Sequence, residues 1–295
     1  MATVASVLGY VRRNKRLGVG VALLLGLFLF ATVGRLFVDP DDAYPLSATP
    51  NQPPSREYPF GTDSQGRNLL ATAVMGTSLT VRIGIIAGTL GLGLGTLLGF
   101  VAAYYGGILD TIIRWVVDVL LTIPSLMVLV VIASSISRKG IGVNGMALVV
   151  SILAWMWPTR TIRSQVLTLR ERAFVRVAQL SGESNLEIIF KELMPNLLPF
   201  LGASLVGSVT GAVFASLGLQ ALGLGPMREP TLGMTIYWVM YYAAFVRGMW
   251  WWIITPIAII VILFIVIGVL LVARTIRNLV RQESEDNDLE RESLL

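Results

Sequence analysis

The chain has 295 residues, of which 55% are hydrophobic and only 14% are charged. A soluble domain usually carries about 25% charged residues, so this composition indicates a protein that folds in a membrane. The absence of cysteine and histidine excludes disulfide bonds and argues against zinc, iron–sulfur, haem and histidine-dependent acid–base chemistry. The net charge of +5 comes without a basic patch carrying interleaved aromatic residues. We therefore assign it to membrane topology and predict no nucleic-acid partner.

The first 38 residues are expected to form an N-terminal segment and a first transmembrane helix over 17–38. This apolar run is too long for the hydrophobic region of a signal peptide, and no cleavage site follows it, so we predict that it is retained. Residues 39–78 follow as a predicted outer loop. Six prolines between residues 40 and 59 favour extended chain and turns there.

Residues 79–275 are predicted to form a core of five further transmembrane helices. Because a bilayer core is about 30 Å thick, each helix needs about 20 mostly apolar residues. Pro124 should kink one of these helices because it removes a backbone hydrogen bond. Asp118 is the clearest ionisable residue at membrane depth, and we expect it to pair with Arg114, one turn earlier. The apolar runs lie at 83–105, 113–135, 143–164, 197–222 and 250–273.

Six spans place both termini on one side of the membrane, and residues 276–295 form a predicted acidic, disordered tail on that side. If that side is the cytoplasm, fifteen lysines and arginines lie inside and eight lie outside, which favours N-in, C-in by the positive-inside rule. Arg138 and Lys139 fall on the outer side and oppose this assignment. The predicted fold is therefore an all-α integral membrane protein with six transmembrane helices and a cytoplasmic loop between the fourth and fifth.

Small residues recur on one face of the second and fifth predicted spans. Such stripes allow close helix packing in membranes. Two roles are possible for these stripes: static packing between helices, or sliding contacts in a moving gate. In the fifth span, four small residues are candidates to line a pathway, with a packing role as the alternative: Ser204, Ser208, Gly211 and Ser216. In the second span, the glycines expected to support packing are Gly84, Gly88, Gly91, Gly95 and Gly99.

A polar segment at about 165–196 interrupts the hydrophobic core of the chain. Apolar residues at helical spacing from Ile162 to Leu180 predict a helix that continues out of the membrane. Gly182 is expected to end it, because glycine tolerates the left-handed conformation. Ser184 and Glu187 form a predicted capping box that starts a second short helix, which Pro195 should end. Such a short helix needs a packing partner, either this bundle or a soluble protein.

The stretch "RVAQLSGESNLEIIFKELMPN" resembles the coupling motif of permeases from ATP-binding-cassette importers, with Ala178, Gly182 and Pro195 in register. The stretches "PFGTDSQGRN", "RWVVDVLLTIPSL" and "LGLG" resemble the oligopeptide, dipeptide and nickel branch of that family. The resemblance runs from about residue 58 nearly to the end of the core.

The resemblance implies a permease subunit in a bacterial or archaeal plasma membrane that forms half of a pathway. The implied partners are a second permease, two P-loop ATPases and an extracytoplasmic binding protein, besides membrane lipid. No catalytic or metal-binding residue is expected in this chain, and ATP and magnesium belong to the partner subunits because the sequence lacks a P-loop motif. The implied ATPase-docking residues are Arg170, Glu171, Arg176, Ala178, Gly182, Glu183, Ser184, Glu187, Pro195 and Asn196.

Several positions depart from the family pattern. Arg176 replaces the glutamate of the coupling motif, Asn68 replaces an acid, and Ser216 stands where peptide permeases tend to carry a glutamate. Without a carboxylate at that depth, the sequence favours a neutral oligosaccharide over an oligopeptide as the transported oligomer.

The alternatives to an importer permease are a secondary transporter and a homo-oligomeric channel. A secondary transporter should show internal repeats and ligands for coupling ions, which the sequence lacks. A channel is compatible with the glycine stripes but leaves the capped polar segment unexplained.

Overall fold

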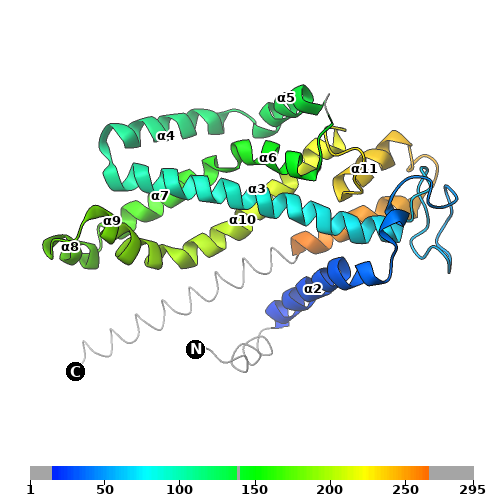
Figure 1. Ribbon diagram of the computed structural model, residues 1–295, viewed down its shortest axis with the longest axis horizontal. Helices are drawn as coiled ribbons and strands as arrows, with labels where there is room; N and C mark the ends of the chain where they lie inside the picture. The colour runs from blue at the N-terminus through cyan, green and yellow to red at the C-terminus, as the bar shows by residue number, and fades with distance from the viewer. Residues whose placement is uncertain (1–14, 138–139, 266–295) are drawn as a thin grey trace.

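The structure is a computed structural model that describes residues 15–137 and 140–265. Within these ranges the chain is helical and contains no strand. The start of the predicted N-terminal segment (residues 1–14), the predicted acidic tail at 276–295 and the pair Arg138–Lys139 lie outside the described residues. The helices form an elongated bundle, with α8 and α9 at one end and the segment 33–68 and α11 at the other (Figure 1).

Helix α3 (Leu69–Tyr105) is the centre of the bundle and packs against α6, α7 and α10 (Figure 1). It begins well before the predicted start at 83, because the Asn68 side chain accepts a hydrogen bond from the Leu70 backbone N–H and caps the helix. The loop predicted over 39–78 is therefore helical from Leu69 onward. At 37 residues the helix is about 55 Å long, so it is longer than a bilayer core is thick.

Helix α2 (Lys15–Thr32) leads into the turn-rich segment 33–68, which contains two short 3-10 helices, η1 (Val33–Leu36) and η2 (Pro40–Ala43). Asp63 organises the end of this segment. Its carboxylate accepts hydrogen bonds from the backbone N–H groups of Gln65 and Arg67 at 2.8 and 2.9 Å. Burial raises the pKa of the Asp63 carboxyl. The predicted turns are present in this segment, and several of its residues are buried.

Two of the predicted spans are sharply bent. Helices α4 (Gly107–Thr122) and α5 (Ser125–Ser137) meet at 85°. Ile123 between them is extended, as expected for a residue before proline, so the kink predicted at Pro124 is confirmed as a complete break. Helices α6 (Val143–Ala154) and α7 (Met156–Arg170) meet at 46°. In an unbroken α-helix, residue 158 would donate its backbone N–H to the Ala154 carbonyl oxygen. Pro158 has no N–H, which explains this second break.

Ion pairs connect α4 to α7. Arg163 contacts Asp110 through two hydrogen bonds, with Nη2 donating to Oδ2 at 2.6 Å. Arg160 lies 3.9 Å from Asp118. The predicted pair between Arg114 and Asp118 is therefore wrong, because α7 supplies a cation to Asp118 that the sequence of α4 alone did not indicate.

The chain continues through α8 (Ala173–Leu180), α9 (Asn185–Glu187) and the π-helical segment η3 (Ile188–Leu193) into α10 (Met194–Ala221). Helix α11 (Leu232–Tyr241) and the apolar helix Trp250–Ile265 follow. Two helices of the described part, α3 and the continuous helix Asn185–Ala221, are long and apolar enough to cross a membrane. The two bent pairs raise this number to four if each pair is one span.

Candidate functional site

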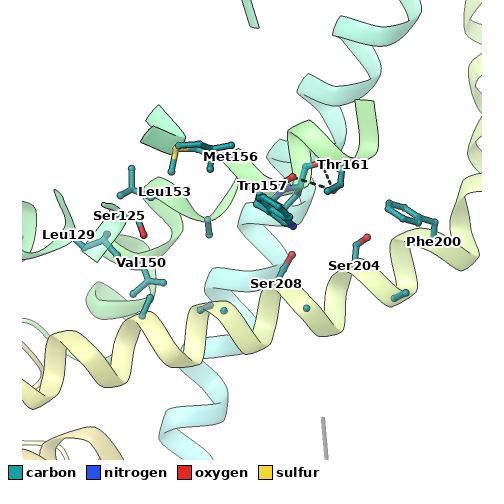
Figure 2. Close-up of a pocket in the computed structure, with 18 residues that line it drawn as sticks. Ser125, Leu129, Val150, Leu153, Met156, Trp157, Thr161, Phe200, Ser204 and Ser208 are labelled. Carbon is teal, nitrogen blue, oxygen red and sulfur yellow. Dashed lines mark hydrogen bonds between the residues drawn. The ribbon is translucent and has the colours of Figure 1, made fainter. Parts of the chain in front are cut away.

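A cavity of about 560 Å³ lies between the two bent helix pairs and α10 (Figure 2). Its walls are mainly apolar, and no charged side chain lines it. The hydroxyl groups among the lining residues belong to Ser125, Thr161, Ser204 and Ser208. In Figure 2, Ser208 points from α10 toward Trp157, and Ser204 projects from the same side of α10. Such a lining can accept uncharged polar groups and aromatic or aliphatic side chains.

The two helix breaks position most of the residues that line the cavity outside α10. Ser125 begins α5 directly after Pro124, so the 85° bend carries it to the cavity. Trp157 and Thr161 follow the second break on α7. Thr161 Oγ1 already donates to backbone carbonyl oxygens of its own helix, at 3.1 Å from that of Pro158. No sequence pattern predicted these residues as part of a site, although Pro124 and Pro158 beside them were the available signal.

The face of α10 toward the cavity is open. A Cβ atom built at Gly207 or Gly211 would meet no heavy atom within 4 Å. Of the four candidate pathway residues, Ser204, Ser208 and Gly211 line the cavity. Ser216 does not, because it is fully buried and its hydroxyl donates to the Val213 carbonyl oxygen at 2.8 Å. A role in the pathway therefore remains a prediction for three of the four.

The glycine stripe of α3 is closely packed. All five glycines are buried. Gly84 and Gly88 face α10, where a Cβ atom built at Gly88 would lie 2.7 Å from the Val209 Cα. Gly91, Gly95 and Gly99 face the junction of α6 and α7, where a Cβ atom at Gly91 would lie 2.6 Å from the Ala154 Cβ. The stripe thus accommodates α10 at its start and then α6 and α7.

The predicted docking module, residues 170–196, differs from its expected form at the first helix. Helix α7 ends at Arg170 and α8 begins at Ala173, because Arg172 between them is extended. The interruption changes the buried face. Val175 and Ala178 pack inward, whereas Val177 and Leu180 are exposed. The single apolar face predicted from Ile162 to Leu180 is therefore wrong beyond α7.

The turn between α8 and α9 forms as predicted. Gly182 has a φ of +82°. Ser184 accepts a hydrogen bond from the Glu187 backbone N–H, and the Glu187 carboxylate accepts one from the Ser184 backbone N–H at 3.0 Å. This last bond, with those from the Ser184 hydroxyl and Lys191, lowers the pKa of Glu187 to about 2. The predicted capping box is confirmed.

The second helix does not end at Pro195. It continues through η3 into α10, giving one helix over Asn185–Ala221. Proline removes a backbone donor and displaces the preceding turn, and the wider π-helical segment directly before it accommodates this change. Asn196 contributes a replacement bond, with Nδ2 donating to the Glu192 carbonyl oxygen at 2.7 Å. The predicted stop at Pro195 was wrong.

Two predicted docking residues, Arg170 and Ala178, are held against the rest of the bundle. Arg170 Nη1 donates to the carbonyl oxygens of Ala103 and Tyr104, at 2.9 and 3.0 Å, at the end of α3. Ala178 is buried against the bundle. Arg176 is exposed and lies 3.3 Å from the carboxylate of Glu171. The surface left for a partner comprises exposed apolar side chains of α8 to η3 with these charges beside them.

Comparisons with known proteins place the chain in a family. Residues 95–281, more than half of the chain, match the family described as binding-protein-dependent transport system inner membrane component. The chain is 29% identical over 247 residues to the dipeptide transport system permease protein DppC of Bacillus subtilis, covering 79% of this chain and 76% of that protein. It is 32% identical over 222 residues to the DppC of Alkalihalophilus pseudofirmus, covering 74% and 72%.

Similarity to an oligopeptide system extends over nearly the whole chain. The oligopeptide transport system permease protein OppC of Lactococcus lactis subsp. lactis is 26% identical over 287 residues, covering 96% of this chain and 95% of that protein. The family resemblance predicted from the four sequence motifs is therefore confirmed. The chain belongs to the binding-protein-dependent transport system inner membrane components, as a multi-pass plasma-membrane permease subunit of the oligopeptide and dipeptide type of ATP-binding-cassette importer.

Proposed function

We propose that this chain forms one half of a translocation pathway for short peptides and pairs with a second permease subunit. An external binding protein delivers the peptide, and two P-loop ATPases bind the docking module. The observation that carries this proposal is the module itself: an ordered helical turn that presents apolar side chains at the end of the bundle farthest from the segment 33–68 (Figure 1).

The exposed residues of the module support docking of a protein. Leu180 is 90% exposed, and Leu186 and Phe190 are also exposed, although each lies on a helix whose other side is buried against the bundle. Exposed leucine and phenylalanine on a rigid element favour a protein partner. Arg172 and Arg176 add positive charge beside them.

A partner must supply the ATP chemistry. The only lysines are Lys15, Lys139 and Lys191, and none follows a glycine, so this chain contains no G-x-x-x-x-G-K motif. We therefore propose a non-catalytic role, with ATP and magnesium bound by the ATPase subunits. With six spans and both termini in the cytoplasm, as the distribution of lysine and arginine favours, the module lies on the side where ATP is available.

The proposed cargo is a peptide rather than an oligosaccharide. The relatives described above are named as dipeptide and oligopeptide permeases. The serine and threonine hydroxyls of the cavity can exchange hydrogen bonds with a peptide backbone as it passes. Because no charged residue lines the cavity, a neutral oligosaccharide remains the second candidate.

Co-purification with a matched pair of variants tests the assembly. Leu180 and Leu46 are both 90% exposed, but Leu46 lies in the segment 33–68 at the opposite end of the bundle. We expect tagged wild-type chain to bring down a second multi-span protein and P-loop ATPases in near-equal amounts. Leu180→Arg should lose the ATPases, and Leu46→Arg should retain them. Equal ATPase recovery with both variants, or isolation of the chain alone as a symmetric oligomer, would overturn the proposal.

Uptake measurements test the cargo. Cells that express the importer with its binding protein should accumulate a labelled tri- or tetrapeptide in an ATP-dependent manner. An unlabelled peptide should compete with this uptake, and an unlabelled oligosaccharide should not. Competition by the oligosaccharide alone would assign the cargo to the second candidate.

A further inference from the structure

A second cavity, of about 540 Å³, lies on the other side of the bundle between α2 and the helix Trp250–Ile265. Its lining is apolar apart from Thr255. Leu23, Gly26 and Phe30 of α2 form one wall, and Ile254, Ala258 and Ile262 belong to the opposite wall. We refer to it as the α2 groove. It shares no residue with the cavity beside α10.

One end of the α2 groove is closed by the segment 33–68. Pro54, Pro59 and Phe60 contribute to the lining there, together with Trp250 and Trp251. The position of Trp251 is fixed, because its Nε1 donates to the Thr62 carbonyl oxygen at 3.2 Å. Tryptophan is enriched where the hydrocarbon core of a bilayer meets water. This roof therefore marks one surface of the membrane.

The depth of the α2 groove corresponds to one leaflet. From Trp250 to Ile262 the lining helix rises about 18 Å, and from Ala22 to Phe30 the lining of α2 rises about 12 Å. One leaflet of the hydrocarbon core is about 15 Å deep. A transmembrane helix of a partner would need about 30 Å and would have to leave the membrane through the roof. A lipid chain ends within the membrane and needs no such exit.

We propose that the α2 groove binds one acyl chain of a membrane phospholipid from the leaflet on the side of the segment 33–68. The chain fills the space between α2 and the helix Trp250–Ile265, with its polar head at the rim beside Trp250. Small residues on both walls, Gly26 and Ala258, provide the width, and a Cβ atom built at Gly26 would meet nothing within 4 Å. Lipid binding in the α2 groove depends only on the membrane location of the chain, whatever its cargo and ATPases are.

Native mass spectrometry of the purified importer in mild detergent tests the site. The variant Gly26→Trp fills the groove. Gly93→Trp is its control, because Gly93 is also an exposed helical glycine with nothing within 4 Å of a built Cβ atom. We expect wild type and Gly93→Trp to retain one more phospholipid per copy of the chain than Gly26→Trp. Ala258→Trp replaces Gly26→Trp if the latter does not fold, and it should also lose the lipid.

Photo-cross-linking supplies a second measurement. A phospholipid with a diazirine at the end of its acyl chain should label groove residues near Leu23 and Ile262 in wild type and in Gly93→Trp, and this labelling should be lost in Gly26→Trp. An equal lipid count in all variants, or labelling spread evenly over the exposed apolar residues, would overturn the proposal. So would a cross-link from a cysteine placed at Gly26 to a protein partner, which would identify a helix as the occupant.

Discussion

Two helices of equal length carry the same sequence pattern with opposite results. Helix α3 and the continuous helix Asn185–Ala221 each have 37 residues, a side-chain cap at the first turn and a stripe of small residues. The stripe of α3 is buried under α6, α7 and α10, whereas Gly207 and Gly211 of α10 face open space. A stripe of small residues therefore indicates a smooth helix face, and its neighbours decide whether that face becomes a packing surface or a cavity wall.

The neighbours differ because of the two helix breaks. Both halves of the fourth predicted span, α6 and α7, pack along α3 and cover its stripe. The cavity lies where the 46° bend at Trp155 and the 85° bend at Pro124 face α10, so the stripe of α10 is left open there. The following predictions test this comparison, from the largest expected effect to the smallest.

The largest effect is expected from filling the closed stripe. In Gly91→Leu the added Cβ atom would lie 2.6 Å from the Ala154 Cβ and 2.8 Å from the Ala154 carbonyl carbon. Backbone atoms cannot move aside, so α3 and α6 must separate, and the variant should lose about 3 kcal/mol or more of stability. Thermal unfolding in detergent measures this loss.

Gly93→Leu is the control for this substitution, because the site is open. Its stability should stay at the wild-type value or rise by up to about 1 kcal/mol, since leucine is the better helix former. Equal losses in the two variants would show that the glycines act through helix flexibility and not through packing.

The next effect concerns the ion pair that holds α4 on α7. Arg163 and Asp110 are about 20% exposed and share two hydrogen bonds. Arg163→Ala should cost about 2 kcal/mol, because it leaves a largely buried carboxylate without a partner. Arg160→Ala should cost less than about 0.5 kcal/mol, because Arg160 and Asp118 are more than half exposed and 3.9 Å apart. A double-mutant cycle with Asp110→Asn separates the interaction energy of the pair from the effects of the two single substitutions. A coupling energy near zero would contradict this role.

Filling the open stripe should affect transport and leave the fold intact. The side chain of Gly211→Leu would extend into the cavity, where a Cβ atom meets nothing within 4 Å. We expect stability within about 0.5 kcal/mol of wild type. Peptide uptake should fall about tenfold, which corresponds to about 1.4 kcal/mol. Gly93→Leu again serves as control, and unchanged uptake in Gly211→Leu would remove this face from the pathway.

Local chemistry made much of this fold predictable. Pro124 breaks its span, Gly182 takes a positive φ, and Ser184 caps the following helix, because each of these depends on one residue and its immediate neighbours. The Asn68 cap belongs to the same class. It also gives a structural reason why an amide can replace an acid at this position, since both side chains supply an accepting oxygen.

Features that depend on distant segments could not be predicted from the sequence. Asp118 pairs with a residue of another helix, and Arg170 binds carbonyl groups at the end of α3 instead of facing a partner. The extended conformation of one residue, Arg172, interrupts the helix, so the buried face of α8 no longer follows the helical spacing of α7. Helical periodicity assumes one uninterrupted phase, so it cannot locate such a shift, nor a π-helical segment that carries a helix past Pro195.

The smallest effect is expected at the cap of the helix that carries the open stripe. Ser184→Ala removes the bond to the Glu187 backbone N–H and should cost about 1 kcal/mol, whereas Ser181→Ala, three residues earlier and also exposed, should change little. Hydrogen exchange of the amides at 185–193 measures the difference.

The difference between these variants should depend on pH. The folded pKa of Glu187 is about 2, below its ordinary value of 4.5, so the charged carboxylate is favoured by the folded module. Its contribution is complete above pH 4.5 and is lost as the pH falls from 4.5 toward 2. The extra protection of wild type over Ser184→Ala should therefore be constant from pH 7 to about 5 and shrink below pH 4.5. A difference that stays constant down to pH 3 would mean that the bond from the Ser184 hydroxyl to the Glu187 carboxylate contributes nothing to the cap, and that the bond from the Glu187 backbone N–H to the Ser184 hydroxyl accounts for the whole effect.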